Sequence, residues 1–93
     1  MIQSFKSKET EKIWDGIRST KLPNEIQQIT RRKLRMLNSS VSVADLRIPP
    51  SNRLEKLSGD LKDYYSIRIN DQCRIIFKWK DGHSFEVEVI DYH

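Results

Sequence analysis

An alternation of apolar and polar residues between positions 65 and 79 constrains the fold of this chain more than any other feature. Its apolar positions are Tyr65, Ile67, Ile69, Cys73, Ile75, Phe77 and Trp79. A period of two is typical of strands that have one buried and one solvent-exposed face. Because β-branched and aromatic residues fill both halves, and an Asn-Asp pair lies in the break between them, the pattern predicts a β-hairpin.

The need to bury one face also predicts the register of this hairpin. A two-residue turn would place Ile69 opposite Arg74 and mix the two faces, whereas a three-residue loop places Ile69 opposite Cys73. Since the second register keeps the apolar face intact, it is the one we expect. It also places Arg68 directly opposite Arg74 on the other face, where like charges repel each other unless an anion lies across them.

The strand that follows the hairpin offers another interpretation of Arg74. If residues 80–82 form a three-residue loop that ends on a positive-φ glycine, Phe77 pairs with Phe85 and Arg74 pairs with Glu88. Arg74 would then belong to a surface ion pair that contributes about 0.2–1 kcal/mol. Pattern alone leaves both interpretations open, the ion pair and the anion-binding site.

Two helices are predicted ahead of the hairpin. Ser7 is expected to cap a helix that runs to about Arg18, with acidic residues in its first turns. A second helix is predicted from about Asn24 to Leu37, because its apolar residues follow a 3.6-residue period. Its second half also carries the basic residues Arg31, Arg32, Lys33 and Arg35. These residues suit the negative end of the helix dipole, or they contact nucleic-acid phosphates or an acidic protein partner.

Further strands are expected around the hairpin, at residues 2–5, 51–57 and 84–91. Helices followed by an antiparallel sheet indicate an α+β fold. We expect the helices to cover the apolar face of the sheet and to leave the face with Arg68 and Arg74 open to a ligand.

Composition bounds the remaining possibilities. With 37% hydrophobic and 32% charged residues and a net charge of +4, the chain is expected to form one domain over residues 1–93 and to favour polyanionic partners. We expect no membrane span and no signal peptide, since no apolar run approaches the ~18–20 residues that a span requires. The single cysteine fits a reducing cytoplasm, and two histidines with one cysteine give no metal-ligand spacing. No metal or cofactor is expected.

The hairpin and the end of the chain resemble a known family. Residues 65–77 resemble the signature hairpin of the RelE superfamily of bacterial toxins. The terminal Asp-Tyr-His at residues 91–93, together with residues 1–5 and 52–55, resembles more narrowly its HigB branch, the toxins of type II toxin–antitoxin pairs. This resemblance implies a microbial-ribonuclease-like fold with two N-terminal helices packed on a twisted antiparallel sheet. It also implies metal-independent cleavage of messenger RNA in the ribosomal A site.

The implied chemistry assigns roles to four residues. The RNA 2′-hydroxyl must lose a proton and attack the adjacent phosphorus, while the leaving 5′-oxygen must gain a proton. Arg74 fits the stabilisation of charge on the phosphate, and His93 fits the proton transfer. Tyr92 is expected to stack on a base or to orient the reacting hydroxyl, and Asp91 is expected to orient His93. From composition alone, His93 would instead be a solvated terminal residue.

The sequence also departs from the family pattern. Better-known relatives carry a histidine and a lysine before the hairpin, where this chain has Glu55 and Ser58. Glu55 is therefore a candidate base, and Lys56 or Arg53 is a candidate for the missing cation. With Arg68, these two basic residues are the ones expected to bind RNA.

The resemblance also implies partners and leaves two other functions to consider. The implied partners are a HigA-type helix-turn-helix antitoxin, the ribosome and messenger RNA, with operator DNA bound only through the toxin–antitoxin complex. ParE-type toxins share the scaffold but poison DNA gyrase without catalysis, and such a binder has no need for a terminal Tyr-His. A catalytically silent RNA-binding module is disfavoured because the sheet has few exposed aromatic residues for base stacking.

Overall fold

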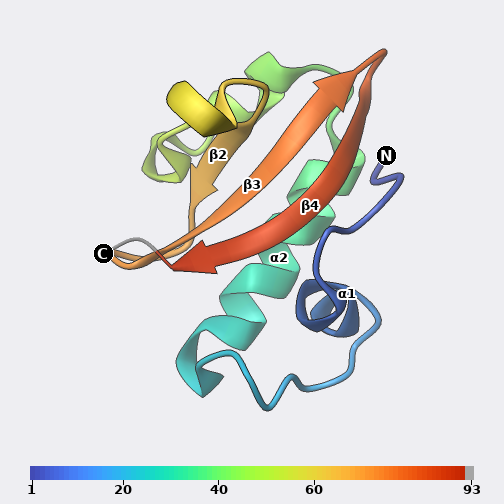
Figure 1. Ribbon diagram of the computed structural model, residues 1–93, viewed down its shortest axis with the longest axis vertical. Helices are drawn as coiled ribbons and strands as arrows, with labels where there is room; N and C mark the ends of the chain where they lie inside the picture. The colour runs from blue at the N-terminus through green and yellow to red at the C-terminus, as the bar shows by residue number, and fades with distance from the viewer. Residues whose placement is uncertain (92–93) are drawn as a thin grey trace.

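The computed structural model describes residues 1–91, in which four antiparallel strands form one sheet in the order β1-β2-β3-β4. The strands are β1 (Glu55–Lys56), β2 (Tyr65–Arg68), β3 (Cys73–Lys80) and β4 (His83–Asp91). The helices are α1 (Lys8–Trp14) and α2 (Gln27–Ser39), and both pack on the same side of the sheet (Figure 1). The predicted α+β fold is therefore confirmed. Short 3₁₀ turns connect these elements at Asn24–Ile26, Val43–Arg47, Pro50–Asn52 and Gly59–Leu61.

The first helix begins where its cap was predicted and ends early. The Ser7 hydroxyl accepts a hydrogen bond from the Thr10 N–H at 3.3 Å, which satisfies one of the free donors at the helix start. The helix ends at Trp14 rather than near Arg18. Gly16 lies just beyond it at φ +83°, a left-handed conformation that turns the chain out of the helix.

The second helix lies close to its predicted position. A 3₁₀ turn at Asn24–Ile26 precedes α2, and α2 continues two residues beyond the predicted end at Leu37. The side chains of Ile26, Leu34 and Leu37 are buried, as their spacing predicted. In Figure 1, β4 passes in front of α2. No helix within residues 1–91 is both long and apolar enough to cross a bilayer.

The core lies between these helices and the apolar face of the sheet. Ile67, Ile75, Phe77 and Val87 point to this side and are fully buried. Each such side chain contributes about 1.5–3 kcal/mol through removal of apolar surface from water. Cys73 is buried beside them, and burial raises the pKa of its thiol. The expectation that the helices cover this face is confirmed.

The hairpin between β2 and β3 has the predicted register. Arg68 lies opposite Arg74, and the Ile69 N–H donates to the Cys73 carbonyl at 2.9 Å. Between the strands, the Asn70 side-chain oxygen accepts the Cys73 N–H at 2.7 Å and closes the loop. The requirement to bury one face was enough to fix this register, because a shift of one residue would expose every apolar side chain.

The predicted register between β3 and β4 is wrong near their turn. Phe85 lies opposite Lys78 rather than Phe77. The turn consists of two residues, Asp81 and Gly82, at φ +54° and +81°. Two successive positive φ values match the right-handed twist of a tight hairpin, so the predicted three-residue loop does not form.

A β-bulge in β4 then moves the register further from the predicted one, because β4 has one more residue than β3 between the pairs Lys78–Phe85 and Ile76–Glu88. Glu86 has φ +51°, and beyond it Val87 faces the core as predicted. The shift places Ile90 opposite Arg74. The predicted ladder pair between Arg74 and Glu88 is therefore wrong.

The N-terminal segment lies along the outer edge of β4. Gln3 donates its N–H to the Ser84 carbonyl at 2.8 Å, and Lys6 donates its N–H to the Val87 carbonyl at 3.0 Å. The two contacts form isolated parallel bridges rather than the short strand expected at residues 2–5. They nevertheless cover polar groups that an uncovered strand edge would expose.

Candidate functional site

A hollow of about 390 Å³ lies at the corner of the sheet where β1, β2 and β3 approach one another. It brings together four residues that the sequence singled out and adds two from the hairpin loop. The lining residues are Arg53, Glu55, Arg68, Asn70, Asp71 and Arg74. Arg74 lies on the sheet face opposite the helices, because its β3 neighbours Cys73 and Ile75 point into the core.

Two hydrogen bonds fix the guanidinium of Arg74. Its Nε donates to the Ser66 hydroxyl at 2.9 Å, and its Nη2 donates to the Arg53 carbonyl at 2.7 Å. The side chain is only 12% exposed. A guanidinium carries five N–H groups, so within residues 1–91 these two bonds leave three without a hydrogen-bond partner.

Arg53 presents its carbonyl to Arg74 through an unusual backbone conformation. It follows the 3₁₀ turn Pro50–Asn52 and has φ +45° and ψ +56°, in the left-handed region. A residue with a Cβ is strained there by about 1–2 kcal/mol, so the surrounding structure must impose the conformation. Asn52, which is fully buried, donates its side-chain amide to the Leu46 carbonyl at 3.1 Å and holds the turn.

Glu55 reaches the same hollow from the edge strand. It lies opposite Ser66 in the β1–β2 pairing, so it shares a face with Arg74. Its carboxylate oxygen is 3.9 Å from Arg74 Nη2, and its side chain is 57% exposed. An ion pair this long and this exposed contributes about 0–1 kcal/mol, so the carboxylate can turn toward a ligand at little cost.

Arg68 is partly neutralised within the hollow. It forms an ion pair with Asp71 of the hairpin loop, whose side chain is largely exposed. The lining thus holds three arginines against two carboxylates, which leaves one positive charge in excess. An excess of guanidinium groups with free N–H donors favours an anionic ligand such as phosphate.

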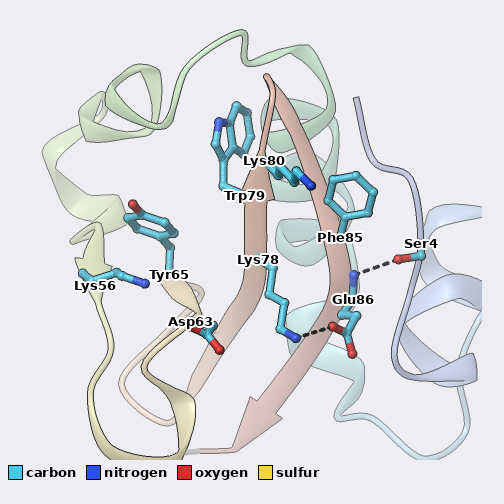
Figure 2. Close-up of a pocket in the computed structure, with 9 residues that line it drawn as sticks. All are labelled: Ser4, Lys56, Asp63, Tyr65, Lys78, Trp79, Lys80, Phe85 and Glu86. Carbon is cyan, nitrogen blue, oxygen red and sulfur yellow. Dashed lines mark hydrogen bonds and ion pairs between the residues drawn. The ribbon is translucent and has the colours of Figure 1, made fainter.

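Lys56 is not brought to this hollow. It pairs with Tyr65 across β1 and β2, and its ammonium lies 4.8 Å from the centre of the Tyr65 ring. It also donates a hydrogen bond to the Lys62 carbonyl. Lys56 lines a second hollow of about 600 Å³ at the other end of the sheet, shown in Figure 2. The other lining residues there are Ser4, Asp63, Tyr65, Lys78, Trp79, Lys80, Phe85 and Glu86.

The last residues of β4 lie beside Arg74 on the neighbouring strand. Ile90 is opposite Arg74, and Asp91 is opposite Cys73, so consecutive residues of β4 alternate between the two faces. Asp91 is thus one strand spacing, about 4.8 Å, from the start of β3. The predicted site residues Tyr92 and His93 lie outside the described residues.

Sequence reasoning missed two residues that shape the site. Ser66 is fully buried, and its hydroxyl accepts the hydrogen bond from Arg74 Nε. Because Ser66 precedes Arg68 by two residues, the alternation already placed it on the same sheet face as Arg68 and Arg74, and this could have identified it. Asn52 had no such signal, because a polar residue after two prolines is typical of an exposed turn.

Comparison with known proteins identifies related sequences and one related fold. A family model described as RelE-like toxin of type II toxin-antitoxin system HigB matches residues 3–93. The chain is 45% identical over 83 residues to Toxin HigB-1 of Vibrio cholerae serotype O1, covering 88% of this chain and 87% of that protein. It is 28% identical over 94 residues to Endoribonuclease HigB of Proteus vulgaris, with complete coverage of both.

A solved structure supports the fold alone. The YoeB dimer from Staphylococcus aureus superposes with a TM-score of 0.57 at 21% sequence identity. The match covers 99% of this chain and 94% of that chain.

Proposed function

Because this chain belongs to the RelE-like HigB family of toxins of type II toxin–antitoxin systems, we propose that it is an endoribonuclease that cleaves messenger RNA on the ribosome and so inhibits translation. The related Proteus vulgaris protein is named as an endoribonuclease. The observation that carries the proposal is the guanidinium of Arg74, which two hydrogen bonds hold in a hollow whose lining has an excess of positive charge.

The proposed reaction is an in-line attack on the phosphate that follows the reacting ribose. The 2′-oxygen forms a bond to phosphorus, the bond from phosphorus to the 5′-oxygen breaks, and the products are a 2′,3′-cyclic phosphate and a 5′-hydroxyl. Negative charge builds on the phosphate oxygens, and the free N–H groups of Arg74 stabilise it. Because the protein already holds this side chain, little reorganisation is needed as the charge develops.

Proton transfer is assigned to residues on either side of Arg74. Glu55 accepts the proton of the 2′-hydroxyl, since its exposed carboxylate lies near the guanidinium. His93 in its charged form donates a proton to the leaving 5′-oxygen. Tyr92 stacks on a base or orients the reacting hydroxyl, and Asp91 orients His93. The pairing of Ile90 with Arg74 supports this arrangement, because it brings β4 alongside the hollow.

The remaining partners follow from the same proposal. Arg53 and Arg68 would bind RNA phosphates next to the cleaved bond, whereas Lys56 could bind only a more distant part of the strand. A cognate HigA-type helix-turn-helix antitoxin would neutralise the toxin, and operator DNA would be bound only through that complex. The substrate implies a cytoplasmic site of action.

Primer extension on cellular messages after induction tests the proposed function. We expect cuts inside the codons of translated messages, and no cuts when Arg74→Ala is expressed at the same level. Growth arrest without cuts, accompanied by linear DNA from trapped gyrase, would instead support a ParE-type poison.

A further inference from the structure

Lys33 on α2 is a buried cation without a charged partner among the described ion pairs. The residue is only 9% exposed, and its ammonium donates a hydrogen bond to the neutral side-chain oxygen of Asn52. None of the ion pairs within residues 1–91 includes Lys33. Burial lowers the pKa of this ammonium, and the positive charges of Arg32 and Arg68 lower it further. Removal of an ammonium from water at such a position is costly unless its N–H groups are hydrogen-bonded.

The partner of this lysine leads directly to the candidate site. Asn52 is fully buried, and its amide nitrogen donates to the Leu46 carbonyl and to the sulfur of Met36, each at 3.1 Å. The next residue is Arg53, whose left-handed backbone aims its carbonyl at Arg74 Nη2, 2.7 Å away. A continuous series of contacts therefore connects α2, the turn before β1, and the guanidinium on β3.

We propose that Lys33 and Asn52 are positioning residues, which hold the Arg53 carbonyl where it orients the guanidinium of Arg74. A strained backbone persists only where surrounding contacts impose it, and the Lys33–Asn52 bond is one of those contacts. Without it, Asn52 can turn, the Arg53 carbonyl shifts, and Arg74 keeps only its bond to Ser66. The effect on cleavage rests on the proposed function, whereas the effect on the orientation of Arg74 does not.

Lys33→Met tests this inference because it removes the charge and the donor while it keeps an unbranched chain of similar length. Lys8→Met is the matched control, since Lys8 is exposed on α1 and takes part in none of the described contacts. The first readout is the rate of rotation about the Nε–Cζ bond of Arg74, measured by NMR. The bond from Nη2 to the Arg53 carbonyl slows this rotation. We expect Lys33→Met to speed it about tenfold or more, as for loss of one hydrogen bond that involves a charged group.

The second readout is cleavage of messenger RNA on programmed ribosomes. We expect kcat to fall about 10- to 100-fold in Lys33→Met while KM changes little, because a displaced catalytic group affects the reacting state more than binding. Thermal stability should change little, because removal of the buried ammonium offsets the loss of its hydrogen bond to Asn52. Lys33→Arg, which keeps a donor of similar reach, should recover most of the rate.

The two readouts separate failure of this inference from failure of the proposed function. Unchanged Arg74 rotation in Lys33→Met would overturn the positioning role, whatever the cleavage assay shows. Loss of cleavage together with loss of stability would also overturn it, because that pattern indicates a purely structural role. If the wild-type protein cleaves no message but Lys33→Met still frees the Arg74 guanidinium, the proposed function fails and the positioning role stands.

Discussion

At the residue scale, the candidate site depends on how the protein divides the five N–H groups of one guanidinium. Ser66 and the Arg53 carbonyl take one each, and both come from elements adjacent to β3. The Glu55 carboxylate, at 3.9 Å, is too far to hold the group on its own. Orientation of Arg74 thus depends on neutral acceptors, which leave its full charge available to a phosphate.

Ser66→Ala should weaken both activity and stability. The substitution removes the acceptor for Arg74 Nε, and loss of one hydrogen bond to a charged group destabilises the fold by about 1.5–3 kcal/mol. We expect the cleavage rate to fall about tenfold or more, since the guanidinium is then held at one atom only. Single-turnover cleavage and urea unfolding measure the two effects, with Thr20→Ala, which removes an exposed hydroxyl, as the control. Equal rates for the two variants would rule out a role for Ser66 in orienting Arg74.

At the element scale, local backbone choices decide where the strands pair. The turn between β3 and β4 uses positive φ at both Asp81 and Gly82, and the bulge uses positive φ again at Glu86. Between them they move β4 relative to β3, so that Ile90 rather than Glu88 faces Arg74. This shift removes a potential ion-pair partner from Arg74 and leaves the guanidinium to the hollow.

Gly82→Ala isolates the conformational part of this turn. A Cβ at position 82 would lie 3.5 Å from the Val41 carbonyl oxygen, an ordinary contact, so crowding adds little. The φ of +81° is unfavourable for alanine, and we expect the free energy of unfolding to fall by about 1–2 kcal/mol. Urea denaturation measures this change. No loss of stability would mean that the turn adopts another conformation.

The 3₁₀ turn Val43–Arg47 predicts how the stability of the protein depends on pH. The Asp45 carboxylate accepts the N–H groups of Val41 and Ser42, and these bonds lower its pKa below the usual 3.8. A lowered pKa in the folded state stabilises the protein above the unfolded value, and this contribution is lost as pH falls through the folded value. The wild-type protein should therefore be more stable than Asp45→Asn at pH 7, and this difference in the free energy of unfolding should shrink below about pH 4. Urea unfolding at several pH values would refute this if the difference stayed constant.

At the scale of the whole molecule, the sheet separates two layers with different roles. The helices bury the apolar face, while the corner hollow lies on the opposite face, where β1, β2 and β3 meet. A net charge of +4 is combined with an excess positive charge in that hollow. Binding of RNA there should include a substantial electrostatic contribution.

Salt dependence of RNA binding tests this charge distribution. Affinity for an RNA oligonucleotide with a 2′-deoxy group at the cleavage position, which cannot react, should fall as salt rises. Arg53→Ala should lower the slope of log affinity against log salt by about 0.7, the value for one phosphate contact with a single strand. Fluorescence anisotropy measures the slope. Lys8→Met is the control, because it removes one positive charge from an exposed residue on α1. An identical slope for Arg53→Ala and wild type would show that Arg53 binds no phosphate.

The sequence predicted those parts of the fold where only one arrangement of the strands buries the apolar side chains. The alternation of apolar and polar residues correctly predicted that Arg68 lies opposite Arg74, because any other register would expose the apolar residues. It could not predict the bulge at Glu86, since a positive φ there depends on the sheet as a whole. It also could not predict a buried Lys33, because a run of basic residues on a helix is usually solvated, and its neutral partner Asn52 is distant in sequence.

The most direct measurement is single-turnover cleavage of messenger RNA on programmed ribosomes by wild type and Arg74→Ala. Removal of one preorganised donor of this kind is expected to lower the rate about 100- to 1,000-fold, with folding and antitoxin binding intact. Cleavage by Arg74→Ala at the wild-type rate would contradict the assignment of this hollow as the catalytic centre.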